Sequence, residues 1–166
     1  MHPALLIVDL QKRFQKESPT IAASFAEVIP VINDTSALFR QCHLPVVFIQ
    51  HKNEAEKLLP GVVDFDLPDE LVVKPGDRRI IKTYGNAFAK TSLQADLQDL
   101  AVDSVVVCGF CAEYCVLDTC RGAKEADFKA FLLHNGLASS SREHIHFVEE
   151  INEGISFEAL KIFFED

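Results

Sequence analysis

The sequence predicts a single α/β domain of three layers, in which a doubly wound, mostly parallel sheet lies between two layers of helices. Apolar runs of strand length recur along the chain, and segments with helical spacing of apolar residues separate them. Runs that are apolar at every position are typical of parallel strands covered on both faces. The alternation of strands and helices therefore favours a Rossmann-like α/β/α architecture.

Length and charge limit the classes of protein that the chain fits. Its 166 residues are enough for one domain with one buried core, so we expect a single domain over residues 1–166. The formal net charge is −9, from 16 basic and 25 acidic residues, which makes nucleic acids and anionic membranes poor partners. No apolar run approaches the roughly 20 residues of a membrane span. The chain also does not open on a basic region followed by a long apolar stretch, which a secretory signal requires.

The cysteines favour a reducing compartment. They are five in number, and four of them fall between residues 108 and 120, a pattern that does not suggest a disulfide framework. The cluster lacks the second Cys-x-x-Cys pair of a structural metal site. Cys108 and Cys120 are expected to be buried as small apolar side chains. We therefore expect a cytoplasmic protein with no metal and no other cofactor.

Five apolar runs and one short edge segment predict the strands of the sheet. They cover residues 4–8, 46–49, 79–82, 105–108, 129–133 and 155–157. The first run ends on Asp9, so this carboxylate is expected at the C-terminal edge of the sheet. Open α/β sheets bind their ligands at that edge.

The first helix is expected late in the segment that follows the first strand. Residues 15–27 have an irregular pattern, and a helix is expected to begin near Pro30, because proline is tolerated in a first helical turn. It ends near Gln41. The inward positions of this helix are expected to be Ile32, Ser36 and Phe39.

Two capping boxes and a long loop organise the rest of the chain. Residues 91–94 and 140–143 match the capping-box pattern and are each expected to open a helix. The inward positions are Leu93, Leu97 and Leu100 in the first helix and Phe147, Val148 and Ile151 in the second. A last helix is expected over residues 158–165. Residues 51–79 are charged and rich in proline and glycine, and a loop of this length in a compact domain is usually functional.

Cys115 occupies the position that makes it a candidate nucleophile. Residues 105–108 form a buried strand, and Val116, Cys120 and Ala123 then follow at the spacing of one helical face. Cys115 is therefore expected in the first turn of a helix that leaves the C-terminal end of a strand. The positive end of a helix dipole favours the thiolate, so we expect the pKa of this thiol to fall from roughly 8.5 towards neutrality.

Three motifs together resemble a known family. Residues 9–14 read Asp-Leu-Gln-Lys-Arg-Phe and match the pattern Asp-x-Gln-x-x-Phe. Lys82 is followed by Asn-Ala-Phe at residues 86–88 and by Thr-Ser-Leu at residues 91–93, matching Lys…Ser-Ala-Phe-x-x-Thr-x-Leu. Residues 109–116 match Gly-x-x-Thr-x-x-Cys-Val at every fixed position except residue 112. In this order and spacing, over nearly the whole chain, the motifs resemble the isochorismatase-like cysteine hydrolases, which include nicotinamidases.

This resemblance implies a catalytic triad of Asp9, Lys82 and Cys115. Cys115 would attack the carbonyl carbon of a small amide or ester and form a thioester. Asp9 would accept the thiol proton, pass it to the leaving amine and later activate water, and Lys82 would balance the local charge. The resemblance also implies a cis peptide bond between Phe110 and Cys111, with the backbone N–H groups of Cys111 and Cys115 directed at the developing oxyanion.

The resemblance carries further expectations about the pocket and the assembly. Phe14, Phe110 and Tyr114 flank the triad, and they either form walls of the substrate pocket or serve packing alone. A homo-oligomer is implied, commonly a dimer or a tetramer. The partner expected in the site itself is a small-molecule substrate.

Two positions depart from the family pattern. Ala112 replaces the threonine that precedes the nucleophile, which removes a hydroxyl from the pocket. Nicotinamidases resemble one another in an Asp-x-His…His metal site after the second strand, whereas residues 49–54 here contain the single histidine His51. The chain is thus similar to metal-free hydrolases of the family, and nicotinamide is a less favoured substrate.

Two other functions remain open from the sequence. A vinyl-ether hydrolase of the isochorismatase type would use Asp9 without a thioester, so it would retain activity in a Cys115→Ala variant. A binding or redox module would cycle Cys111 and Cys115 between thiols and a disulfide without turnover. A scaffold without activity is a weaker alternative, because it would give the triad no purpose.

Overall fold

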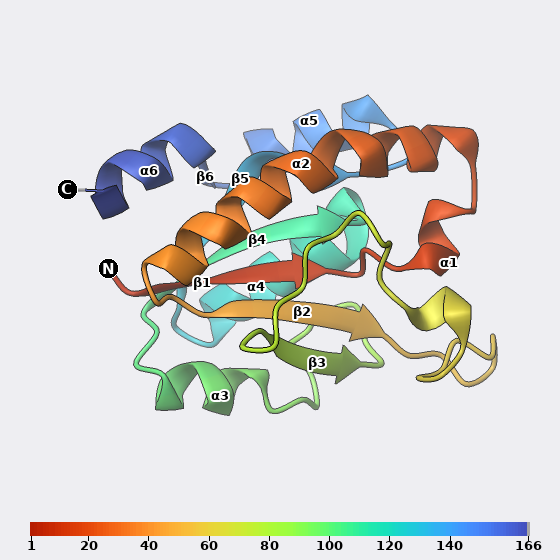
Figure 1. Ribbon diagram of the computed structural model, residues 1–166, viewed down its shortest axis with the longest axis horizontal. Helices are drawn as coiled ribbons and strands as arrows, with labels where there is room; N and C mark the ends of the chain where they lie inside the picture. The colour runs from red at the N-terminus through yellow and green to blue at the C-terminus, as the bar shows by residue number, and fades with distance from the viewer. Residues whose placement is uncertain (166) are drawn as a thin grey trace.

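Six parallel strands form one sheet in the order β3-β2-β1-β4-β5-β6 in the computed structural model, which describes residues 1–165 (Figure 1). The strands are β1 (Pro3–Val8), β2 (Val46–His51), β3 (Arg78–Lys82), β4 (Ser104–Phe110), β5 (Lys129–Ala138) and β6 (Gly154–Ile155). The chain builds the sheet outward from β1 in one direction and then outward from β4 in the other. This confirms the doubly wound fold and places the reversal of strand order between β1 and β4, where such sheets bind ligands.

Helices cover both faces of the sheet. They are α1 (Lys12–Gln15), α2 (Pro19–Gln41), α3 (Leu93–Asp99), α4 (Leu117–Glu125), α5 (Arg142–Glu150) and α6 (Phe157–Glu165), with a 3-10 turn η1 (Val63–Phe65) and a π-helical turn η2 (Ala112–Val116). Buried side chains of α3, α4 and α5 belong to the core on one face, and those of α2 and α6 belong to the core on the other. Within residues 1–165, no helix combines the length and the apolar character needed to cross a bilayer.

Strand β1 shows why the central strands of the sheet are apolar on both faces. Ala4, Leu6 and Val8 belong to the core beneath α3 and α4, whereas Leu5 and Ile7 belong to the core beneath α2. Successive side chains of a strand point to opposite faces, so a strand covered on both sides must be apolar at every position.

Helix α2 begins at Pro19, so the expectation of an irregular segment over residues 15–27 and a helix start near Pro30 is wrong. Ser18 is the N-cap, and its Oγ accepts a hydrogen bond from the N–H of Ile21 at 3.1 Å. Pro19 occupies the first turn, and Pro30 lies inside the helix. The buried face is continuous from Ile21, Phe25, Val28 and Ile29 to the expected Ile32, Ser36 and Phe39. Tertiary packing of this long face outweighs the signal of an internal proline.

The two capping boxes do not form. The N-caps of α3 and α5 are Ser92 and Ser141, and neither side chain makes a capping hydrogen bond. Thr91 instead donates its hydroxyl to the carbonyl oxygen of Ala87 at 2.6 Å.

Helix α5 also presents a different face from the expected one. Val148 is buried, but Phe147 and Ile151 are 56% and 47% exposed. The helix packs on the sheet through Ile145 and Val148, which are one helical turn apart. The buried face therefore includes Ile145 and excludes the expected Phe147 and Ile151.

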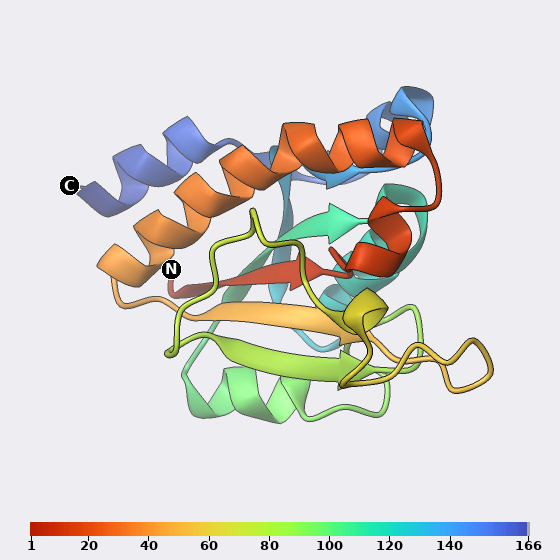
Figure 2. The same ribbon diagram turned by 45° about the vertical axis from the view of Figure 1, so that its right-hand side comes forward.

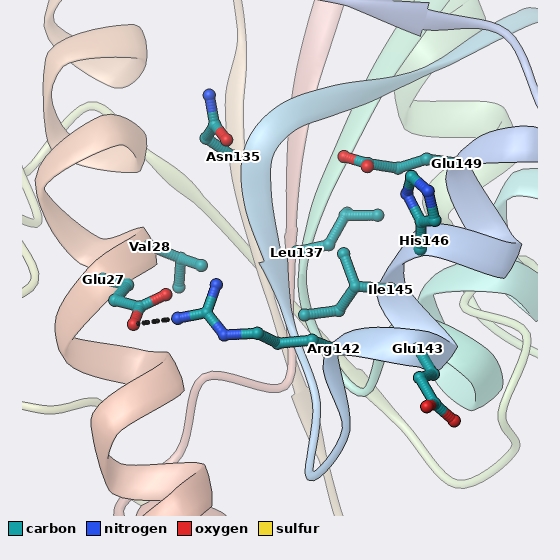
Figure 3. A pocket seen from close by; sticks show the side chains of 9 residues that line it. All are labelled: Glu27, Val28, Asn135, Leu137, Arg142, Glu143, Ile145, His146 and Glu149. Atoms are coloured by element: carbon teal, nitrogen blue, oxygen red, sulfur yellow. Dashed lines mark hydrogen bonds and ion pairs between the residues drawn. The ribbon is translucent and has the colours of Figure 1, made fainter.

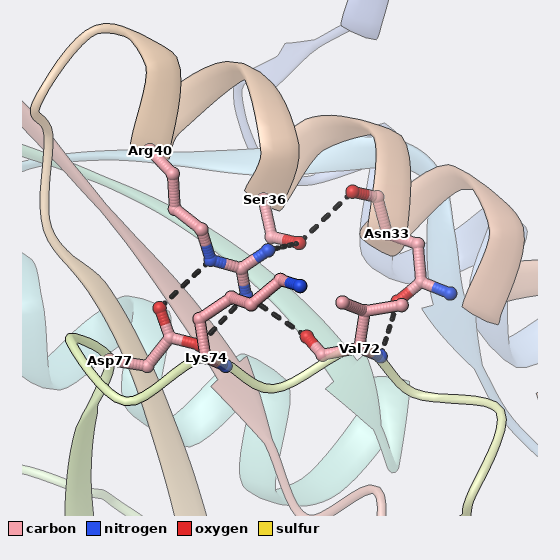
Figure 4. Close-up of polar contacts among 6 residues, drawn as sticks. All are labelled: Asn33, Ser36, Arg40, Val72, Lys74 and Asp77. Atoms are coloured by element: carbon pink, nitrogen blue, oxygen red, sulfur yellow. Dashed lines mark hydrogen bonds and ion pairs between the residues drawn. The ribbon is translucent and has the colours of Figure 1, made fainter.

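The long loop after β2 is attached to α2 by polar contacts (Figure 4). Arg40 donates from Nε and Nη2 to the two carboxylate oxygens of Asp77 at 2.9 and 2.7 Å, and from Nη2 to the carbonyl oxygen of Val72 at 2.9 Å. The Asn33 side chain exchanges hydrogen bonds with the carbonyl oxygen of Glu70 and the N–H of Val72. Figure 2 shows the loop rising from the carboxyl ends of the strands towards α2 and returning to β3. The contacts with α2 hold this segment in one path.

Candidate active site

The carboxyl edge of the sheet brings together the three residues of the predicted triad. Asp9 follows β1, Lys82 ends β3, and Cys115 lies in the turn η2 after β4. The Nζ of Lys82 lies 2.8 Å from Oδ2 of Asp9, and both side chains are almost excluded from solvent. Asp9 and Cys115 line the same cavity, whereas Lys82 lies beneath its floor.

Asp9 leaves the strand in a left-handed conformation, with a φ of 49°. Aspartate is among the few residues other than glycine that adopt this conformation readily. Its N–H still donates to the carbonyl oxygen of Ile49 at 2.9 Å, so the turn begins where the sheet ends. Among residues 1–165, no group forms a hydrogen bond with Oδ1 of this buried carboxylate. Asp9 therefore has a buried acceptor without a hydrogen-bond partner, and the Cys115 thiol interacts with the same carboxyl group and lowers its pKa.

Gln11 fixes the turn that follows Asp9. Its Nε2 donates to the carbonyl oxygens of His51 and Phe65 at 3.1 Å each, and its Oε1 accepts from the N–H of His51 at 2.7 Å. The side chain is fully buried. The glutamine of the first motif thus joins the ends of β1 and β2 to η1 and holds the edge of the sheet in place.

Lys82 uses its ammonium group fully. It donates to Asp9, to the carbonyl oxygen of Tyr84 at 3.0 Å and to Nδ1 of His51 at 3.3 Å. An ammonium has three N–H donors, so its orientation is fixed. Burial and the charge of Lys82 lower the pKa of His51, which keeps the imidazole neutral and able to accept this hydrogen bond. The sequence alone did not identify His51 as part of this network.

Electrostatics at the cavity floor differ from the sequence expectation. Burial raises the pKa of Asp9, and the neighbouring Lys82 opposes this rise. Burial, together with the Asp9 carboxylate, raises the pKa of Cys115 to about 12. The expected fall of the thiol pKa is therefore wrong. Cys115 precedes α4, which begins at Leu117, and the loss of solvent outweighs any effect of the helix dipole.

The cavity beside Cys115 has a volume of about 390 Å³ and an aromatic wall. All three predicted wall residues, Phe14, Phe110 and Tyr114, line it. The rings of Phe14 and Phe110 are in contact, with centroids 5.5 Å apart. The cavity is of the size that accepts a small organic molecule.

Cys111 also lines this cavity. The peptide bond that joins it to Phe110 is cis, as the family resemblance implies. Its carbonyl oxygen accepts hydrogen bonds from the N–H groups of Tyr114 and Val116 at 3.1 and 3.2 Å. Its thiol lies 3.9 Å from the hydroxyl of Ser139, and burial raises the pKa of this thiol to about 12.

A second polar cluster in the cavity wall was missed from the sequence. Glu113 accepts a hydrogen bond from the Ser139 hydroxyl at 2.7 Å through Oε2 and lies 2.8 Å from Nδ1 of His144 through Oε1. Ser139 also accepts from the N–H of Ser141 at 3.2 Å. These partners lie 26 and 31 residues from Glu113 in the chain, so no local pattern indicates the cluster.

A larger cavity of about 630 Å³ lies between α2 and α5, away from the triad (Figure 3). Its wall includes Glu27 and Arg142, which form an exposed ion pair at 2.7 Å, and the side chains of Asn135 and Leu137 from β5. It contains none of the three triad residues. The smaller cavity is therefore the candidate active site.

The donor groups near the triad do not fit a metal site. His51 faces the ammonium of Lys82, which repels a cation. Within the described part of the chain, no three His, Cys, Asp or Glu side chains gather in an arrangement that would bind a metal ion.

Comparison with known proteins identifies the family. The family model described as "Isochorismatase domain" matches residues 3–151. The chain is 27% identical over 158 residues to Nicotinamidase 3 of Arabidopsis thaliana, covering 84% of this chain and 75% of that protein. It is 32% identical over 144 residues to streptothricin hydrolase of Streptomyces noursei, covering 82% of this chain and 54% of that protein.

A solved structure gives the same fold. The isochorismatase-like hydrolase from Alkaliphilus metalliredigens superposes with a TM-score of 0.87 at 20% sequence identity, over 99% of this chain and 98% of that one. The family match spans most of the chain, and the matched relatives are named as hydrolases. The chain therefore belongs to the isochorismatase family, as its three motifs predict, and is an enzyme of the hydrolase class.

Proposed function

We propose that the protein hydrolyses a small amide through a covalent thioester on Cys115, with Asp9 as the general base. One observation carries this proposal: Asp9 and Cys115 line one cavity, and the Asp9 carboxylate interacts with the Cys115 thiol. The name of one relative, a nicotinamidase, supports C–N bond hydrolysis as the reaction class, and the name of the other, streptothricin hydrolase, supports hydrolysis.

The first half of the reaction forms the thioester. Asp9 removes the proton from the Cys115 thiol as the sulfur attacks the carbonyl carbon of the amide. The carbonyl oxygen gains negative charge and accepts hydrogen bonds from the backbone N–H groups of Cys111 and Cys115. Each such donor typically lowers a barrier of this kind by about 3–4 kcal/mol. Protonated Asp9 then gives its proton to the leaving nitrogen, the C–N bond breaks, and the amine departs.

The second half releases the acid. Asp9, again ionised, removes a proton from water, and the hydroxyl oxygen attacks the thioester carbon. The tetrahedral intermediate collapses, the C–S bond breaks, and the Cys115 sulfur recovers a proton from Asp9. The carboxylic acid leaves, and the enzyme returns to its starting state. Both halves require a carboxylate that can hold and return one proton.

The charges and pKa shifts of Asp9, Lys82 and Cys115 support the role of Asp9 as the general base. A raised pKa makes a carboxylate a stronger base than an exposed one, which favours proton transfer from a thiol. The ion pair with Lys82 favours the ionised form of Asp9 and so opposes the rise in pKa that burial causes. In the resting state, the thiol of Cys115 is protonated, so the nucleophile is formed only during attack.

A redox module receives less support from the same observations. Redox-active cysteines have thiolate character at neutral pH, because their thiol pKa is lowered. Burial raises the pKa of both Cys111 and Cys115 to about 12. The vinyl-ether reaction remains the alternative that the variants below separate.

The test is a panel of small primary amides, including nicotinamide, assayed for ammonia release. We expect the wild-type protein to hydrolyse at least one member, and both Cys115→Ala and Asp9→Asn to lose at least about a thousandfold in kcat. Cys42→Ala, a change of the same kind at a half-buried cysteine outside the cavity, is the matched control and should retain activity. Ammonia release by Cys115→Ala at the wild-type rate would overturn the thioester. No ammonia release from any amide, together with hydrolysis of a vinyl ether that Cys115→Ala retains and Asp9→Asn loses, would favour the vinyl-ether reaction.

A further inference from the structure

The cavity beside Cys115 has an excess of carboxylates in its wall. Asp9, Glu17, Glu56 and Glu113 line it, and among the described residues no lysine or arginine does. Lys82 lies beneath the floor, and its charge is already offset by Asp9 at 2.8 Å. The potential in the cavity is therefore negative, which attracts a cationic ligand and repels an anionic one.

Glu113 is the most firmly positioned of these carboxylates. Its side chain is 14% exposed, and contacts with Ser139 at 2.7 Å and His144 at 2.8 Å hold its two oxygens. Burial raises the pKa of this carboxyl group, but hydrogen bonds from Cys111 and Ser139 outweigh burial and hold the pKa below its usual range. Each carboxylate oxygen can accept more than one hydrogen bond, so acceptor capacity remains for a ligand.

The other two carboxylates contribute less. Glu17 is exposed, and Glu56 lies 3.9 Å from the half-exposed Arg13, which partly offsets the charge of Glu56. Neither side chain is held in a fixed position by hydrogen bonds to neighbours in the way that Glu113 is. Glu113 is therefore the carboxylate whose position suits a defined contact with a bound molecule.

The aromatic wall suits the same kind of ligand. The cavity is lined by three aromatic residues, Phe14, Phe110 and Tyr114. Among the described residues, no lysine or arginine lines it with them. The faces of aromatic rings attract organic cations, and such a contact gains when the cation is partly desolvated. Aromatic rings combined with a carboxylate are a recognition surface for an ammonium group.

An independent observation points to the other end of the ligand. Oδ1 of Asp9 is buried and has no hydrogen-bond partner among residues 1–165. A buried acceptor without a partner is costly, and a ligand with an N–H group would satisfy it. The amide nitrogen of a substrate attacked by Cys115 supplies such a group.

We propose that the substrate is a small amide that carries an organic cation, with Glu113 as the residue that determines this specificity. The proposal rests on the amide hydrolysis proposed above. The cationic group contacts Glu113 and the aromatic rings, while the scissile amide lies between Cys115 and Asp9.

Three primary amides of the same length test this. They are γ-trimethylammoniobutyramide, its uncharged tert-butyl isostere, and glutaramate, which carries a carboxylate at the same place. We expect kcat/KM for the cation to exceed that of the isostere by about tenfold, the scale of one partly exposed charge contact, and glutaramate to be the poorest. Raising the salt concentration should reduce the preference, because ions screen the contact.

Glu113→Gln keeps the shape of the side chain and removes its charge. This variant should bring the ratio of kcat/KM for the cation to kcat/KM for the isostere down from about ten to about one, whatever its effect on the two values separately. Glu143→Gln is the matched control, because Glu143 is exposed and outside this cavity. A variant that keeps the tenfold preference would overturn the proposal. If Glu113→Gln does not fold, the salt dependence of the wild-type preference decides, and a preference that salt does not change overturns the proposal.

Calorimetric binding to Cys115→Ala separates this proposal from the proposed function. Tighter binding of the cation than of the isostere, without hydrolysis of any amide by the wild-type protein, would overturn the amidase function and support charge recognition by the cavity. Hydrolysis of the isostere as fast as the cation would support the amidase and overturn the cation preference. Equal binding of all three amides to Cys115→Ala, or binding of none of them, would also overturn the cation preference.

Discussion

Lys82 donates a hydrogen bond to Asp9 at 2.8 Å beneath the cavity that Cys115 lines, and neither of the two side chains is more than 2% exposed. A buried charge is tolerated only when it is paired, so each of these residues depends on the other. The pair also sets the chemistry above it. Lys82 opposes the rise that burial causes in the pKa of Asp9, and the Asp9 carboxylate adds to the rise that burial causes in the pKa of Cys115.

The dependence predicts strong coupling in a double-variant cycle. Asp9→Asn and Lys82→Met should each lower the free energy of unfolding by about 3–5 kcal/mol, because each leaves one buried charge without a partner. The double variant should lose less than the sum, since neither charge remains. Urea unfolding measures all three. The exposed pair Lys16–Asp64 is the control, where the two effects should add, and additive effects at Asp9 and Lys82 would contradict the account.

Reactivity of Cys115 should depend on pH in an unusual way. With a thiol pKa of about 12, the rate of alkylation by iodoacetamide should rise about tenfold per pH unit from pH 7 to 10 without a plateau. A free thiol levels off near its pKa of about 8.5. Peptide mapping assigns the label to Cys115. A plateau near neutral pH would show a stable thiolate and contradict the raised pKa.

The Asp9→Asn variant should separate reactivity from catalysis. The Asp9 carboxylate raises the thiol pKa, so its replacement by a neutral amide should lower that pKa and accelerate alkylation of Cys115 at neutral pH. The same variant should lose hydrolysis, because the base is absent. Slower alkylation in Asp9→Asn would instead mean that Asp9 favours the thiolate in the resting enzyme.

The loss of activity at low pH should follow the protonation of the Asp9 carboxylate. Burial raises its pKa, and the ionised form is the active one, so activity should fall with decreasing pH at a value above the usual aspartate range of about 3.9. Lys82 opposes the rise, so Lys82→Met should move this acid limb to still higher pH in whatever activity remains. The measurement is kcat/KM against pH. An acid limb at or below the ordinary aspartate value would contradict Asp9 as the base.

The attachment of the long loop should depend on the shape of Arg40. Arg40→Lys keeps the charge but loses the paired contacts with Asp77 and the hydrogen bond to Val72, which should cost about 1–3 kcal/mol of stability. Arg142→Lys changes an exposed pair with Glu27 and should cost about 0–1 kcal/mol. Thermal unfolding compares the two, and equal small effects would contradict a structural role for Arg40.

Local sequence was sufficient for the sheet and for the edge that carries the site. The apolar run of β1 and its end at Asp9 are readable because a strand buried on both faces has no polar position. The position of Cys115 after β4 follows from the same reasoning. The meeting of Asp9, Lys82 and Cys115 came from the family resemblance, because three strand ends far apart in the sequence carry no local mark of their proximity.

Other features depend on tertiary packing and were missed or reversed. The start of α2 was misplaced because Pro30 resembled a first-turn proline, whereas the continuous apolar face from Ile21 decides the helix. The thiol pKa of Cys115 was reversed because burial, which the sequence does not show, outweighs the helix end. The contact of Glu113 with Ser139 and His144 joins segments that only the fold brings together.

The measurement that tests the central claim most directly is partition of the acyl group between water and hydroxylamine. An amide and the methyl ester of the same acid are hydrolysed by the wild-type protein in the presence of hydroxylamine, and the ratio of hydroxamate to acid is measured. If both pass through one thioester on Cys115, the ratio is the same for the two substrates, and Cys115→Ala forms neither product. A ratio that differs with the leaving group, or product formation by Cys115→Ala, would contradict a Cys115 thioester.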